Sequence, residues 1–237
     1  MVEMTFALYS ENLRLVHETI NQFKTKSTVR LLVISKQQSI EKIQFIYSLG
    51  EKCFGENYVQ ELLRKAPQLP SDIQWTFVGS LQKNKCKALL KLKNLQRIST
   101  LDSIELVCRI QNICEKTNRT VEIMIQVKVF DEMSKRGIMV DDVKHLTEYV
   151  IYSCKNLIFK GFFVIAPTNG TEKTISECFQ KVLDLRQTAL LHWDSFKNAA
   201  CFEISMGKFS AHDNFFLFYI QIGKTYHNAK IFDLPAK

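Results

Sequence analysis

A single (β/α)8 barrel of the TIM type, with an extra N-terminal helix, is the α/β fold that this sequence predicts. The 237 residues, 46% hydrophobic and 24% charged, are enough for one large hydrophobic core. Short β-branched or aromatic runs alternate with helical patterns, which is typical of a parallel sheet with right-handed crossovers. Eight such units within about 210 residues fit a closed barrel better than an open sheet. We therefore expect residues 1–237 to form one domain, with residues 1–26 as a helix that packs on the barrel.

The predicted elements follow one another along the chain. Apolar residues at helical spacing predict the first helix within residues 4–25. Strands are expected at residues 30–35, 52–54, 74–78, 97–100, 121–129, 157–165, 201–205 and 218–222. Helices are expected at residues 39–50, 59–66, 83–91, 103–117 and 139–153, and in a long segment that includes residues 175–190. The connection at residues 208–217 is barely long enough for a helix.

Composition narrows the class of protein. The apolar runs are far too short to cross a membrane, and the N-terminus lacks the features of a signal peptide, so we expect a cytoplasmic protein without a membrane partner. The seven cysteines lack metal-type or redox spacing and the five histidines are scattered, which predicts reduced cysteines and no metal site. The net charge is +8, with lysines concentrated between Lys83 and Lys93. No nucleic-acid-binding motif accompanies them, so we interpret them as a solvated helix face.

Lys36 is the most unusual residue of the predicted barrel. It directly follows a run of apolar strand residues, and ligands of such barrels bind at the C-terminal ends of the strands. Burial lowers the pKa of a lysine and makes its amine a nucleophile for carbonyl compounds, although a lysine that reaches solvent is the alternative. Small residues at 205–207 and 223–225 are expected at the usual phosphate-binding corner. A reactive lysine opposite a phosphate site suits a phosphorylated aldehyde, and pyridoxal 5'-phosphate (PLP) is the leading cofactor of that kind.

Three longer segments, at residues 31–36, 54–61 and 75–85, resemble the pyridoxal phosphate homeostasis family. The resemblance continues in order from about residue 12 to residue 230. It implies a barrel like the N-terminal domain of alanine racemase, with PLP in Schiff-base linkage to Lys36. It also implies a protein that holds, buffers or delivers PLP without catalysis. We expect a monomer, with apo-enzymes that receive PLP as its partners. The cofactor-binding residues that we expect are Lys36, Asn57, Ser205, Gly207, Gln221, Gly223 and Thr225.

The sequence departs from the family pattern near its C-terminus. Lys208 follows the Ser-Met-Gly motif, Gln221 replaces an arginine expected at the pyridine nitrogen, and Lys224 precedes a late hydroxyl at Thr225. These changes leave a second class open, an interaction protein with a decayed cofactor site that binds an acidic partner through its basic helix. An enzyme acting on amino acids is disfavoured, because no acid or base is placed opposite Lys36. From the residue at 221 we predict that Gln221→Arg tightens PLP binding several-fold.

Overall fold

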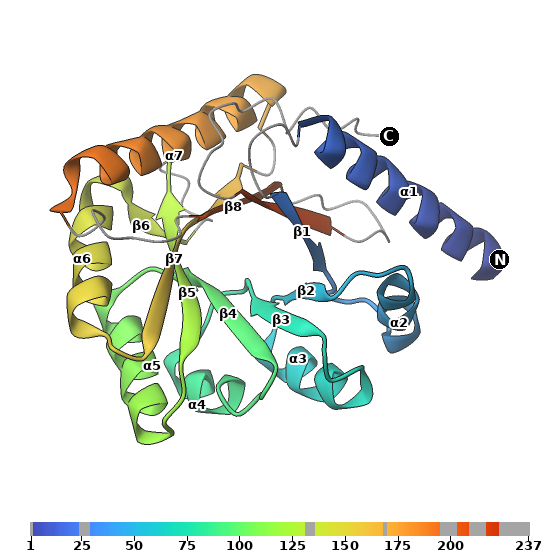
Figure 1. The fold of residues 1–237 in the computed structure, drawn as a ribbon, viewed down its shortest axis with the longest axis horizontal. Coiled ribbons are helices and arrows are strands. Elements are labelled where there is room, and N and C mark those ends of the chain that lie inside the picture. Colours follow the sequence, from blue (N-terminus) through green and yellow to red (C-terminus); the bar gives the residue numbers. More distant parts are fainter. Residues whose placement is uncertain are drawn as a thin grey trace.

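The computed structural model describes residues 2–23, 29–130, 136–167, 170–194, 203–208 and 217–222. Its strands are β1 (Val29–Ile34), β2 (Cys53–Glu56), β3 (Gln74–Phe77), β4 (Leu95–Leu101), β5 (Val121–Lys128), β6 (Ile138–Met139), β7 (Leu157–Ala166), β8 (Glu203–Lys208) and β9 (Leu217–Ile222). They form one sheet in the order β4-β3-β2-β1-β9-β8-β7-β5-β6, and a further pairing of β4 with β5 closes it. The predicted barrel is therefore confirmed (Figure 1).

Helices surround this ring of strands. They are α1 (Val2–Phe23), α2 (Ile40–Ser48), α3 (Val59–Lys65), α4 (Cys86–Leu89), α5 (Ile104–Lys116), α6 (Val143–Ser153) and α7 (Glu172–His192). Figure 1 shows α2 to α7 outside the strands. The first helix buries Tyr9, Leu13 and Ile20, and its Phe6 ring lies 4.4 Å from the ring of Phe45 in α2. The expected N-terminal helix thus packs on the barrel through an apolar face.

The direction of the last strand differs from the prediction. From β1 to β8, neighbouring barrel strands pair in parallel, but β9 is antiparallel to both β1 and β8. A parallel crossover needs about a dozen residues or more, and residues 209–216 are too few for one. The expectation of a parallel eighth strand was therefore wrong, and the short connection noted in the sequence is the physical reason.

Alternation along the strands separates two apolar clusters. Leu32 and Ile34 of β1 belong to a small cluster with Met124 and Phe163, which lie on β5 and β7 across the barrel. Leu31 and Val33 of β1 belong to the larger cluster that includes the buried faces of the helices. Even-numbered residues of β1 therefore face the barrel interior, and odd-numbered residues face the helices.

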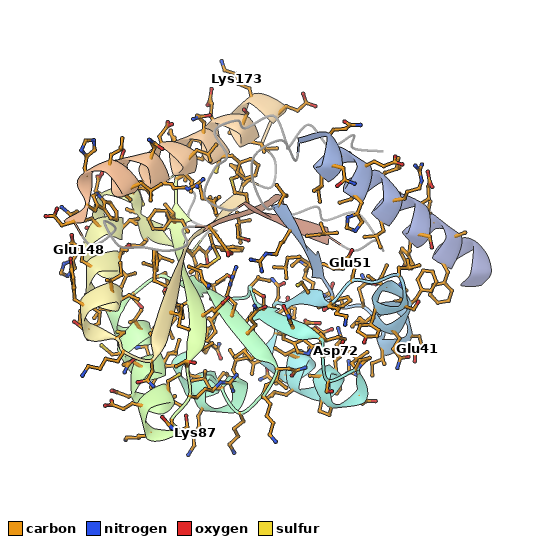
Figure 2. All side chains as sticks on the ribbon, in the orientation of Figure 1. Glu41, Glu51, Asp72, Lys87, Glu148 and Lys173 are labelled. Atoms are coloured by element: carbon orange, nitrogen blue, oxygen red, sulfur yellow. The ribbon has the colours of Figure 1, made fainter. Side chains whose placement is uncertain are left out.

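Three local elements differ from the predicted ones. The expected helix at residues 83–91 is a 3₁₀ turn (Lys83–Lys85) followed by the short α4, and Lys87 of this segment points away from the barrel (Figure 2). The two-residue strand β6, absent from the prediction, adds to the edge of β5. Strand β8 extends to Lys208 because β7 offers it partners as far as Ala166.

The cysteines of the described segments are all free thiols, as expected, and Cys201 lies outside those segments. Burial raises the pKa of Cys114, Cys154 and Cys178 to about 11. These thiols therefore stay protonated at neutral pH and act as small apolar residues of the core.

Candidate functional site

Lys36 lies immediately after β1, where the strands β1 and β2 end side by side. The parallel register pairs Val33 with Phe54 and Ile34 with Gly55. Lys36 follows β1 and Asn57 follows β2, so the two residues lie at the same end of these paired strands. Lys36 is half-buried. This end is the C-terminal mouth of the barrel, where such folds bind ligands.

A tight turn carries Lys36. The N–H of Gln38 donates to the carbonyl oxygen of Ser35 at 3.1 Å, and Gln37 between them has a φ of +59°. Only a few per cent of residues other than glycine adopt this left-handed conformation, which costs roughly 1–2 kcal/mol. The backbone at Gln37, the residue after Lys36, is therefore strained, and its surroundings must hold it.

A buried charged cluster lies directly behind this turn. The ammonium of Lys65, which is fully buried, donates to the carbonyl oxygen of Ser35 at 2.7 Å and to Glu56 Oε1 at 2.8 Å. Its third oxygen partner is Glu61 Oε1 at 2.6 Å. Glu61 also accepts the N–H of Gln37 at 2.8 Å. The Lys65 ammonium thus donates two hydrogen bonds and forms ion pairs with two carboxylates.

This cluster was not predicted from the sequence. Its signal was the spacing of Lys65, which falls three residues after Leu62 on the face of α3 that otherwise carries apolar side chains. Desolvation raises the pKa of the Glu56 carboxyl, although its hydrogen bond with Lys65 opposes the shift. Glu56 Oε2 is buried without a hydrogen-bond partner. The cluster therefore contains two acids and one base in a dry environment.

Asn57 provides an unsatisfied polar atom at the same end of the barrel as Lys36. Its Oδ1 is buried and has no hydrogen-bond partner in the structure. The backbone of this residue is fixed by close packing, because a Cβ atom on Gly79 after β3 would lie only 1.8 Å from the Asn57 carbonyl oxygen. A buried amide oxygen without a partner is expected where a ligand supplies the partner.

Ser205 and Gly207 lie within β8 rather than after it. Ser205 pairs with Phe163 of β7 and is fully buried, and its Oγ is a second buried atom without a partner. Gly207 pairs with Ile165 and is also buried. Ser205 was expected to end the strand and Gly207 to follow it; Gly207 lies within the strand instead, because the pairing with β7 continues to Lys208.

Gln221 does not lie at the end of the barrel where Lys36 lies. In the antiparallel register it pairs with Arg30 near the start of β1, whereas Leu217 pairs with Ile34 at the end of β1. The predicted position of Gln221 at the C-terminal mouth was therefore wrong, and the reversed direction of β9 is the reason. Gly223 and Thr225, the other residues expected at the phosphate corner, lie outside the described residues.

This register reverses the expected effect of Gln221→Arg. An arginine there would lie across from Arg30 rather than near Lys36. We expect unchanged PLP affinity and slightly lower stability, because like charges on directly opposed strand residues repel each other. Equilibrium titration with PLP and thermal unfolding of both proteins measure these effects. Several-fold tighter binding would contradict the antiparallel register.

The rim across the barrel from β1 is cationic. Lys128 ends β5, and Arg136 follows in the segment that leads to β6. The side-chain amide of Gln126 donates to the carbonyl oxygen of Arg136 at 2.9 Å and fastens that segment to the rim. These three residues line a small pocket with Pro167. Asp102, which follows β4, is half-buried. Desolvation raises the pKa of its carboxyl, and the positive charge of Arg136 partly opposes this shift.

The opposite end of the barrel contains a second charged cluster. Arg97 of β4 is almost completely buried and donates to Glu122 at 2.7 Å and to Glu203 at 2.8 Å. Lys160 lies 3.1 Å from the second oxygen of Glu122, and Arg30 lies 3.6 Å from Glu203. These residues occupy the first half of each strand, away from the end with Lys36. We therefore interpret this cluster as a structural plug of the barrel.

The side chains at the mouth fit PLP. Lys36 supplies an amine for an aldehyde, and Asn57, which follows the neighbouring strand β2, carries a buried polar atom without a protein partner. The Oγ of Ser205 is another such atom, but Ser205 pairs with Gln221, which does not lie at this end of the barrel. Within the described segments, no three His, Cys, Asp or Glu residues gather as they would around a metal ion. Among the same segments, no helix is long and apolar enough to cross a membrane.

A lysine at the end of the first strand of an eight-stranded barrel defines the class of the alanine racemase N-terminal domain. The model of that family, "Alanine racemase, N-terminal domain", matches residues 10–206. The chain is also 33% identical over 177 residues to the pyridoxal phosphate homeostasis protein of Schizosaccharomyces pombe, and the match covers 74% of each protein. The chain belongs to the pyridoxal phosphate homeostasis protein family, as the sequence segments indicated.

Two solved structures of PipY share the fold of this chain. PipY of Synechococcus elongatus without PLP superimposes with a TM-score of 0.69 at 24% identity, covering 81% of this chain and 88% of PipY. PipY with PLP bound gives a TM-score of 0.59 at 25% identity, covering 73% and 83%. The barrel is thus shared with a structure that contains PLP.

Proposed function

We propose that this chain binds PLP covalently through Lys36 and takes part in PLP homeostasis as a non-catalytic carrier or buffer. The observation that carries the proposal is the half-buried Lys36 at the strand end, beside the unpartnered amide oxygen of Asn57. A lysine amine condenses with an aldehyde and releases water. The covalent bond that forms retains the aldehyde without any further reaction. The membership in a family named for PLP homeostasis supports this role.

The proposal includes several finer statements. Lys36, Asn57 and Gly207 contact the cofactor, whereas Ser205 pairs with Gln221 and shares its position. Gln221 is no longer a candidate, and Gly223 and Thr225 follow Ile222, which pairs with Val29 at the start of β1, so the direction of β9 gives them no support as phosphate ligands. The chain acts in the cytoplasm as a monomeric single domain, and apo-enzymes that need PLP receive it.

Titration of the purified protein with PLP tests the proposal. We expect saturable binding, a yellow protein, and one pyridoxyl group fixed on the peptide with Lys36 after borohydride reduction. Common amino acids added to the loaded protein are expected to turn over no faster than with free PLP. A colourless protein that takes up no PLP would contradict the proposal and favour an interaction protein. Turnover that disappears in Lys36→Ala would instead show an enzyme.

A further inference from the structure

Two side chains of α3 hold the two peptide groups that flank Lys36. Lys65 donates to the carbonyl oxygen of Ser35 at 2.7 Å, and this oxygen belongs to the peptide before Lys36. Gln37 donates its N–H to Glu61 at 2.8 Å, and this N–H belongs to the peptide after Lys36. Because Lys65 and Glu61 are themselves 2.6 Å apart, one ion pair fixes the backbone on both sides of Lys36.

The turn at Lys36 requires such support. Gln37 has a φ of +59°, in the left-handed region that side chains disfavour. Strained residues of this kind persist only where the surrounding structure over-determines them, and they gather at functional sites. The N–H of the strained residue is the group that Glu61 binds. The ion pair therefore acts at the point of strain.

The composition of the cluster argues against a role in stability alone. Lys65 is fully buried, and apolar side chains of similar volume often stabilise a fold as well as a buried ion pair does. Glu56 beside it has one oxygen without a partner and a pKa raised by burial. If α3 only had to pack on β1 and β2, a leucine at residue 65 would be sufficient. The charged pair additionally forms hydrogen bonds of defined direction with the two peptide groups that flank Lys36.

We propose that Glu61 and Lys65 are positioning residues that aim Lys36 into the barrel mouth and thereby set how tightly PLP is held. They act through the backbone of the turn and do not contact the cofactor. This inference rests on the proposed function, because it concerns PLP held on Lys36. The position of the turn, however, can be measured without PLP.

The experiment compares Glu61→Leu with a matched control at the other end of the barrel. The side chain of Glu61 is 17% exposed and pairs with the fully buried Lys65, while that of Glu122 is 19% exposed and pairs with Arg97, which is 3% exposed. Glu122→Leu therefore removes a comparable partner from a buried cation without touching the turn. Glu61→Gln is the conservative variant, because its amide oxygen still accepts the N–H of Gln37.

Two readouts are needed, with thermal unfolding to confirm that each variant is folded. Hydrogen exchange of the peptide around residues 35–38, without cofactor, reports the hold on the turn. Equilibrium titration with PLP reports cofactor retention. In Glu61→Leu we expect exchange at Gln37 to be about tenfold faster and PLP affinity to be about tenfold weaker. Glu61→Gln is expected to lie within about twofold of the parent protein in both readouts, and Glu122→Leu to leave both unchanged.

Several results would overturn the inference. Unchanged exchange at Gln37 in Glu61→Leu would show that the ion pair does not hold the turn. Faster exchange with unchanged PLP affinity would show that the turn does not govern retention. Equal losses of PLP affinity in Glu61→Leu and Glu122→Leu would show that the loss comes from general destabilisation of the fold and not from the turn at Lys36. The parent protein could bind no PLP while exchange at Gln37 is still faster in Glu61→Leu than in the control. In that case the proposed function is wrong, but the ion pair does stabilise the turn.

Discussion

Lys36→Ala is expected to abolish the visible absorbance of the PLP-loaded protein and to weaken PLP binding by about 100-fold or more, which corresponds to about 2.8 kcal/mol. The substitution removes the amine that makes the covalent link and leaves only hydrogen bonds to hold the cofactor. Lys36 lies after β1 in a turn that other side chains hold, so the fold is expected to survive. Absorbance spectra and equilibrium titration measure the two effects.

The matched control for this change is Lys128→Ala. Lys128 is also a half-buried lysine at the end of a barrel strand, but it lies on β5, across the mouth. We expect this variant to keep the visible absorbance, with at most a few-fold loss of affinity from the missing positive charge. Loss of absorbance in Lys128→Ala together with its retention in Lys36→Ala would move the covalent site to the far rim.

Arg97→Met is expected to give the largest loss of stability, about 3–5 kcal/mol in the free energy of unfolding. Arg97 is almost completely buried and is the shared partner of Glu122 and Glu203. Without its guanidinium, Glu203 keeps, among the described residues, only the half-exposed Arg30 as an ion-pair partner, at 3.6 Å. For a chain of this length such a loss lowers the melting temperature by on the order of 10 °C. Thermal and denaturant unfolding are the measurements.

A double variant distinguishes the ion pair from the packing of Arg97. Adding Glu203→Leu to Arg97→Met removes the uncompensated carboxylate and is expected to recover much of the lost stability, because apolar replacements of whole buried pairs are often neutral. A loss below about 1 kcal/mol in Arg97→Met alone would mean that water reaches Glu203 and that the cluster is not a buried plug.

Much of the barrel could be predicted from the sequence because buried parallel strands have a local pattern. The apolar run at residues 30–35 predicted a strand that the structure gives as Val29–Ile34, and most other strands agree similarly. The direction of β9 could not be predicted from its residues, since an alternation of apolar side chains is the same in both directions. The length of the connection before it was the only local indication.

The candidate site could also be predicted only in part from the sequence. Lys36 was expected directly after an apolar strand, and in the structure it directly follows β1. The errors in the positions of Gln221 and Gly207 follow from the direction of β9 and the length of β8, which depend on pairing with other strands. Arg97 finds its partners on β5 and β8, far away in sequence, so no local pattern revealed that cluster.

The antiparallel β9 also determines how the first strand is protected during synthesis. Every residue of β1, including the apolar stretch Leu31–Ile34, pairs with β9 on one side. A nascent chain can pair β1 with β2 early, but the other edge of β1 stays open until residues 217–222 have been made. An open apolar edge is a template for strand addition from other molecules. Strand β9, made long after β1, is therefore the strand that protects this edge of β1 from aggregation.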